Sequence, residues 1–288
     1  MIGGTLQGVF TSKEINVCYP ASFIVAGHNK RAFWSKSRDS HTFIRREKEL
    51  PDNKPGRIFN VAVEVTPPGF DFNLPFESWE FKVDQDLLPE WWDWHEARET
   101  VLRELGDWAK HRFINTEVGR LREYRDVIVV KGGLVRELDT PPLLDQDYMI
   151  TVSGGFVEEV LYGCKIYSVC AGGVIDQLVG KSPYYGGGGA RSVRFVQNGG
   201  RVNRVSHRAT IMSVSDGGSV GEASHGGCID QVHLGGLVEH VFDGGRINKV
   251  FDGGVVNVLG KDGRIELLSG EVKEIHPEAH IYTRKLVA

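Results

Sequence analysis

Paired glycines recur every nine residues through the C-terminal half of the chain, and this spacing restricts the possible folds more than any other feature. Each pair is followed by an apolar residue two positions later and by a second one three positions after that, as Gly217-Gly218 is followed by Val220 and Ala223. The unit is therefore Gly-Gly-x-Val-x-x-Val-x-x, and its frame runs from Val157 to Leu268. The pairs that keep the step begin at Gly217, Gly226, Gly235, Gly244 and Gly253.

This unit predicts a β-solenoid. One unit has too few apolar residues to bury a face alone, but stacked units form continuous Val and Ile columns around a dry core. β-branched residues suit the walls of such a stack, and the glycine pairs supply positive φ at its corners. Two glycines in nine residues exclude a stable helix, and glycine does not recur every third residue as collagen requires. We expect the solenoid over residues 123–270, with two units per coil favoured over three and the hand left open.

Metal and cofactor chemistry is not indicated by this repeat. Calcium-binding nonapeptide repeats place Gly at the fourth position and Asp at the sixth, whereas here the fourth is Val or Ile and the sixth includes Arg204 and Gln231. The four cysteines form no Cys-x-x-Cys pair and show no zinc-like spacing, so we expect free thiols. The prediction is that the chain uses no cofactor and no metal.

The N-terminal residues 1–122 have a different composition and contain all six tryptophans. Runs of β-branched and aromatic residues predict strands at 23–26, 58–65 and 79–83, and Pro89 predicts the start of a helix over about 89–113. The stripe on that helix is expected to pack on the sheet, with a tryptophan-lined ligand groove as the alternative. It consists of Trp91, Trp94, Arg98, Val101, Leu105, Trp108 and Arg112.

The expected fold is therefore mainly β. A small α+β head (1–122) precedes the nonapeptide-repeat solenoid (123–270). Residues 271–288 break the frame and suit a C-terminal cap, which an open solenoid end needs.

A basic segment, residues 28–48, is the most suggestive polar stretch of the head. It carries seven lysines and arginines against Asp39 and Glu47, in a chain whose net charge is −4. Arginine beside aromatic residues suits contact with phosphate, nucleotide or nucleic acid; the alternative is a solvated loop balanced by acidic neighbours. The candidate ligand-binding residues are His28, Lys30, Arg31, Trp34, Arg38, Ser40, His41 and Arg45.

Aromatic residues of the solenoid are candidates for an interaction surface. Phe242 and Phe251 occupy successive units at a position expected to face outward, which suggests stacked aromatics in a partner or oligomer interface; the alternative is that a terminal segment covers them. Tyr184 and Tyr185 lie in a Gly-rich tract that replaces one unit and are expected at a bulged turn. The His and Asp residues that precede the glycine pairs are interpreted as turn residues, with a ladder that binds a metal or a cationic partner as the alternative.

The repeat tract at about residues 127–268 resembles repeats in hypothetical proteins of tailed bacteriophages. It is more distantly similar to Gly-Gly/Val repeats in the passengers of self-associating autotransporter adhesins. The phage resemblance implies a small accessory protein in the cytoplasm of the infected bacterial host. The N-terminus has no basic region followed by an apolar one, and no apolar run approaches ~20 residues, so we expect a soluble protein without a membrane partner.

The favoured function is a non-enzymatic binding protein. Its head would hold a host protein, a nucleotide or a nucleic acid through residues 28–48, for example to inhibit a defence pathway, with the solenoid as a rigid arm or oligomerisation surface. A second hypothesis is an enzyme in the head acting on a nucleotide-type substrate, which requires a pocket in which His28, Ser40 or His41 meets a carboxylate. A third is a structural role in the virion or tail fibre. We expect a homo-oligomer.

Overall fold

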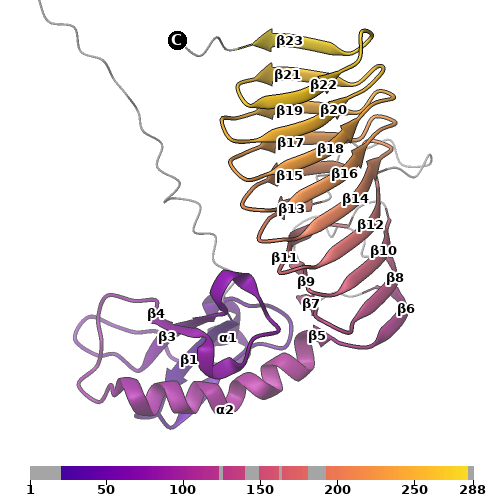
Figure 1. Ribbon diagram of the computed structural model, residues 1–288. Helices are drawn as coiled ribbons and strands as arrows, with labels where there is room; N and C mark the ends of the chain where they lie inside the picture. Colours follow the sequence, from indigo (N-terminus) through magenta and orange to yellow (C-terminus); the bar gives the residue numbers. More distant parts are fainter. Residues whose placement is uncertain (1–20, 123–125, 140–148, 162–163, 181–192, 285–288) are drawn as a thin grey trace, which may run out of the picture.

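The computed structural model describes residues 21–122, 126–139, 149–161, 164–180 and 193–284, and it confirms a mainly β chain with a small α+β head followed by a β-solenoid (Figure 1). The expected strands of the head are present, and two 3-10 turns at Pro68–Phe70 and Phe76–Ser78 join β3 to β4. The regular elements of the head are β1 (Ala21–Ala26), β2 (Arg31–Phe33), α1 (His41–Glu47), β3 (Asn60–Thr66), β4 (Glu80–Val83) and α2 (Trp94–Arg112).

The head is an antiparallel sheet in the order β2-β1-β3-β4 with a helix on each face. Phe23 and Val63 point to one face, where they pack with Trp108 of α2. Alternate residues point to the other face, which α1 covers with the buried Ile44. Helix α2 begins later than Pro89 because the side chain of Asp93 caps it, accepting a hydrogen bond from the backbone N–H of Glu96.

The solenoid consists of two parallel sheets, and successive strands along the chain belong alternately to one sheet and the other. It begins at Phe113, directly after α2 and inside the range that the sequence assigned to the head. One sheet contains β6 (Glu117–Leu121), β8 (Leu134–Leu138), β10 (Phe156–Val160), β12 (Val174–Val179), β14 (Arg201–Ser206), β16 (Ser219–Ala223), β18 (Leu237–Val241), β20 (Val255–Leu259) and β22 (Glu271–Ile275). The other contains β5 (Phe113–Ile114), β7 (Val127–Val129), β9 (Ile150–Ser153), β11 (Ile166–Cys170), β13 (Val193–Val196), β15 (Thr210–Val214), β17 (Cys228–Val232), β19 (Arg246–Val250), β21 (Arg264–Leu268) and β23 (His280–Arg284).

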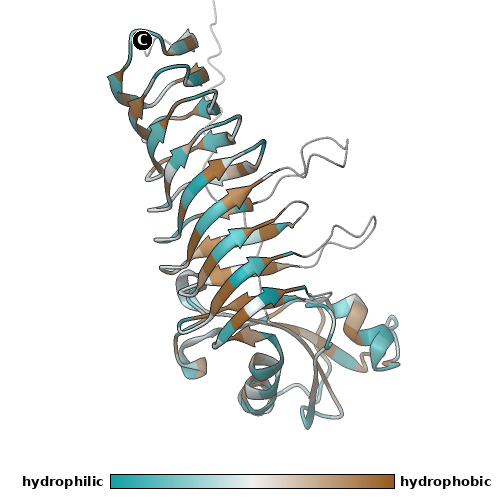
Figure 2. Ribbon diagram, turned by 90° about the vertical axis from the view of Figure 1, so that its right-hand side faces the viewer, coloured by the Kyte–Doolittle hydropathy of each residue, from teal (hydrophilic) through white to brown (hydrophobic). Residues whose placement is uncertain are grey.

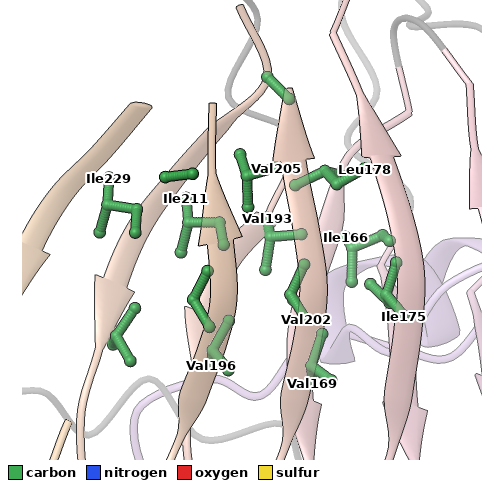
Figure 3. Close-up of a cluster of buried hydrophobic side chains, with 14 of the residues drawn as sticks. Ile166, Val169, Ile175, Leu178, Val193, Val196, Val202, Val205, Ile211 and Ile229 are labelled. Atoms are coloured by element: carbon green, nitrogen blue, oxygen red, sulfur yellow. The ribbon is translucent and has the colours of Figure 1, made fainter. Parts of the chain in front are cut away.

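Two nine-residue units make one coil, as the favoured prediction stated. Val202 pairs with Val220, and Val220 pairs with Val238, so each partner lies two units further along the chain. The columns from the two sheets meet between them (Figure 3) and are fully buried. Figure 2 shows hydrophilic residues interspersed with these hydrophobic ones along the strands, which is the pattern of a wall with one dry side and one wet side.

The two glycines of a pair have different physical roles, which Gly217 and Gly218 illustrate. Gly217 has φ +80°, the conformation that side chains disfavour. A Cβ on Gly218 would lie 2.0 Å from the carbonyl oxygen of Val196 in the preceding coil, so the stacking of coils requires its absence. Asp216 also has positive φ, which agrees with the interpretation of the preceding His and Asp residues as turn residues.

Residues 271–284 continue the solenoid where a frame-broken cap was expected. Strand β22 pairs in parallel with β20, and Glu271 lies beside Val255. Val255 in turn lies beside Leu237 of β18, so the last step along this sheet is two residues shorter than the one before it. Strand β23 pairs with β21 in the same parallel way. The nine-residue frame ends because this coil is shorter, yet the backbone pairing persists.

The head and the first coils share one hydrophobic core. Ile128, Tyr167 and Phe195 belong to solenoid strands, yet they pack in the same cluster as Phe23 and Trp108 of the head. Hydrogen bonds cross the junction as well; the backbone N–H of Phe72, for example, donates to the Ser153 hydroxyl over 3.2 Å. The head therefore packs against the outer face of one sheet in the first coils, as part of one packed structure.

Candidate functional site in the head

The basic segment extends from the β1–β2 turn through β2 to the end of α1. The turn is held by a backbone hydrogen bond from Lys30 to Gly27, and by Asn29, whose buried side chain donates to the Trp91 carbonyl over 2.9 Å. His28 and Lys30 are exposed at this turn, and Arg31 is exposed on β2, one of the two edge strands of the sheet. The segment thus places cations on ordered backbone.

Both acidic residues within the segment already have partners. Asp39 is buried and forms an ion pair with Arg112, with 3.1 Å between Oδ2 and Nε. Glu47 accepts hydrogen bonds from Ser35 and Lys48. Partial burial raises the pKa of Glu47, but these hydrogen bonds outweigh it and lower the pKa below its usual value.

Most of the cations in the segment have no acidic partner among the described residues. Within that part of the chain, no carboxylate lies at ion-pair distance from Lys30, Arg31, Lys36, Arg45 or Arg46. The Nε of Arg45 is in addition buried without a hydrogen-bond partner there. These five cations are therefore not neutralised by a direct ion pair within the described residues.

Aromatic contacts order part of this surface. The guanidinium carbons of Arg38 and Arg46 lie 4.8 and 5.0 Å from the ring centroid of Phe43 in α1. Such cation–π contacts hold guanidinium planes without consuming their hydrogen-bond donors. Ser40 occupies the N-cap position of α1, but its side chain makes no capping hydrogen bond.

The predicted ligand-binding residues fall into separate neighbourhoods. His28 packs on Trp91 with ring centroids 5.5 Å apart, and Trp34 contacts the ring of His111 in α2. His41 instead lies on the α1 face of the sheet. The basic segment is thus a surface around an edge of the head, and its aromatic residues point to different elements.

His41 meets two carboxylates. Its Nδ1 lies 3.3 Å from Oδ2 of Asp84, and its Nε2 lies 3.0 Å from the carbonyl oxygen of Val63. One ligand atom each from His41, Glu64 and Asp84 can be chosen so that all lie within 4.8 Å of one another. Burial raises the pKa of Glu64, the negative charge of Asp84 raises it further, and His41 and Lys82 oppose these effects.

The two carboxylates of this group, Glu64 and Asp84, were not among the candidate binding residues predicted from the sequence. The missed signal is the position of Glu64 within the apolar strand sequence Val61-Ala62-Val63-Glu64-Val65. A lone carboxylate in a half-buried strand suggests a function or a specific partner. The enzyme hypothesis required a pocket in which His28, Ser40 or His41 meets a carboxylate, and His41 supplies the contact with a carboxylate.

The structure does not bring together Phe242 and Phe251, the two residues predicted to form a stacked aromatic surface on the solenoid. Phe242 follows β18 and Phe251 follows β19, so they belong to opposite sheets, because successive units alternate between the sheets. Both are half-buried, and the ring of Phe251 stacks on His233 with centroids 4.6 Å apart, not on Phe242. Tyr184 and Tyr185 lie outside the described residues.

No protein-family model, no curated protein and no solved structure matches this chain. The resemblance to repeat tracts of bacteriophage proteins therefore stays a prediction. In the described part of the chain, no helix is both long and apolar enough to cross a membrane.

Proposed function

We propose that the protein is a binding protein whose head holds a phosphate-bearing ligand, a nucleotide or a nucleic acid, on the basic segment. The observation that carries this proposal is the set of five cations that have no acidic partner among the residues the structure describes. A net positive surface on a chain of charge −4 concentrates polyanions locally.

The chemistry of the cations fits phosphate oxygens. Arg31 and Arg46 are exposed, and each guanidinium offers a planar fork of donors that matches two oxygens of one phosphate. Phe43 supports the guanidinium of Arg46 from below. The solenoid serves this function as a rigid arm, because its parallel strands stack in register from one coil to the next.

Fluorescence anisotropy with a labelled single-stranded oligonucleotide and with a labelled nucleotide tests this proposal. We expect saturable binding that weakens as salt is raised, since phosphate contacts release counterions. Combining Arg31→Gln, Arg45→Gln and Arg46→Gln should weaken binding by about tenfold or more and reduce the salt dependence. The matched control combines Lys249→Gln, Arg264→Gln and Lys273→Gln, which remove three exposed cations of the solenoid. Equal affinities for the two triple variants would contradict the proposal.

A second candidate is an enzyme in the head that acts on a nucleotide-type substrate. It is favoured by the contact between His41 and Asp84, a histidine–carboxylate pair beside the basic surface. Chemical conversion of a bound nucleotide by the wild-type protein, lost in His41→Gln while binding is retained, would select this candidate. Binding without conversion selects the non-enzymatic function.

A further inference from the structure

Rigid elements of the head hold the side chains of His41, Glu64 and Asp84 together. His41 is the first residue of α1, and Glu64 lies within β3 opposite Lys82 of β4. Asp84 directly follows β4, and its backbone N–H donates to the Ala62 carbonyl over 2.9 Å. All three are thus fixed by backbone hydrogen bonding and need no large movement to act together.

The hydrogen bond to the Val63 carbonyl determines which ring nitrogen of His41 has a lone pair available for a ligand. A carbonyl oxygen only accepts, so Nε2 carries the hydrogen and donates it. In the neutral imidazole, Nδ1 then presents a lone pair toward the Asp84 carboxylate, another lone-pair donor, at 3.3 Å. Two such atoms at this distance need a proton or a cation between or beside them.

A metal-ligating histidine almost always donates its second ring N–H to a carbonyl, a carboxylate or water, and the contact with Val63 is of this kind. One imidazole nitrogen with two carboxylates suits Zn²⁺, Mn²⁺ or Fe²⁺, whereas Mg²⁺ and Ca²⁺ prefer oxygen ligands alone. His41 and Glu64 are half-buried and Asp84 is exposed, so one side of the group faces solvent. That side leaves coordination positions open.

We propose that Nδ1 of His41 and the carboxylates of Glu64 and Asp84 bind one divalent transition-metal ion. This site uses none of the five cations that carry the proposed function, and neither proposal depends on the other. It also replaces the expectation from the sequence that no metal is used. The competing explanation of the contact between Nδ1 and Asp84 is an ion pair with a protonated His41, which needs no metal.

Isothermal titration of the full chain with Zn²⁺ and with Mn²⁺ at pH 7.5 tests the site, with Mg²⁺ as the comparison ion. We expect one binding site per chain, and His41→Gln, Glu64→Gln and Asp84→Asn should each weaken it at least tenfold. The control is His95→Gln, which removes an exposed histidine paired with Glu99 at 3.2 Å and should leave the affinity unchanged. No heat with either transition metal, or loss of binding in His95→Gln alone, would overturn the proposal.

The C-terminal end of the solenoid carries a second, independent inference. Strands β22 and β23 are the outermost strands of their sheets, and within the described residues nothing pairs with their outer edges. Ile275 and Tyr282 are 46% and 58% exposed there. Val272 and Ile281 pack on the core but are only partly buried. An open edge of this kind is a template for a further strand.

The sequence contains one coil's length of repeat outside the solenoid. In residues 3–20, Gly3-Gly4 is followed by Leu6 and Val9 at the spacing of the unit, and Ile15 and Cys18 keep the apolar positions through the next nine residues. These residues lie outside the described part of the chain. The segment is as long as two units, which is the length of a coil set by the pairing of Val202 with Val220.

We propose that residues 3–20 add a coil to the open solenoid end of a second copy of the chain. The open end of the same chain is out of reach, because Ala21 already belongs to β1 in the head, at the opposite end of the solenoid (Figure 1). Such head-to-tail contacts are heterologous, so they build rings or open chains of copies.

Light scattering of the full chain over a range of concentrations tests this assembly. We expect oligomers that Leu6→Asp, in the donor segment, and Val272→Asp, at the open end, each reduce to monomers. Mixing the two variants should restore a dimer, because each retains one functional half of the contact. Gln7→Asp is the control and should assemble like the wild type. Failure of the mixture to dimerise, or oligomers in Leu6→Asp alone, would overturn the proposal; the latter would indicate a symmetric contact between solenoid ends.

Discussion

At the residue scale, a buried group of three charged side chains connects the head to the solenoid. Arg112 is fully buried and lies between Asp39 of the head and Asp126, which precedes β7. Its two terminal nitrogens donate to the carbonyls of Asp126 and Ser35 over 3.0 and 2.8 Å. Two carboxylates thus share one guanidinium. Burial raises the pKa of Asp39 to about 6; Arg112 opposes this effect, and the charge of Asp126 adds to it.

This shift predicts how stability depends on pH. The folded protein holds the proton on Asp39 more tightly than the unfolded chain, whose carboxyl has a pKa of 3.8. The stability contributed by this proton is complete below about pH 3.8 and is lost as the pH rises through about 6. Between pH 4.5 and 7.5, the unfolding free energy of the wild type should fall by about 1–3 kcal/mol more than that of Asp39→Asn.

Urea unfolding across this pH range measures the difference. Asparagine retains an oxygen that can accept from Ser22 and Trp108, as Oδ1 of Asp39 does, so the variant should still fold. Asp86→Asn removes an exposed carboxylate and serves as the control, with a pH profile parallel to that of the wild type. A profile of Asp39→Asn that also runs parallel would show that another group carries the pH dependence.

At the scale of elements, the solenoid could be predicted from the sequence and much of the head could not. The repeat spacing alone predicts how the strands of the solenoid pair. Val220 and Val238 lie two units apart in the sequence, and they are also paired residues on neighbouring strands. The strands and the long helix of the head were visible as apolar patterns, and its basic segment as a run of charge. The shorter coil at residues 271–284 was missed because the nine-residue frame ends there although the pairing continues.

Contacts between secondary-structure elements could not be predicted from the sequence pattern of any one segment. The group of His41, Glu64 and Asp84 depends on the register of β3 against β4 and on the face that α1 covers, and neither is encoded within one segment. The positions of Phe242 and Phe251 also could not be predicted correctly from their spacing in the sequence. Their spacing of one unit suggested neighbours, but neighbours within one sheet lie two units apart.

At the scale of the whole molecule, the shared core makes the head and the first coils one structural unit. Helix α2 leads into β5 without a linker, and Ile128 of β7 points into the cluster that holds Trp79 and Trp108. All six tryptophans of the chain lie in the head. Tryptophan fluorescence therefore reports on the head, whereas far-UV circular dichroism reports mainly on the strands of the solenoid.

Truncating one buried isoleucine at each end of the solenoid tests this coupling. Ile128→Ala should cost about 2–4 kcal/mol, as for other large-to-small core changes, and should lower the denaturation midpoint seen by tryptophan fluorescence although the residue lies outside the head sequence. Ile265→Ala removes an equally buried side chain near the open end. Since coils contact only their neighbours, this variant should lower the circular dichroism midpoint more than the fluorescence midpoint. An unchanged fluorescence midpoint in Ile128→Ala would instead mean that the head unfolds independently of the coils it covers.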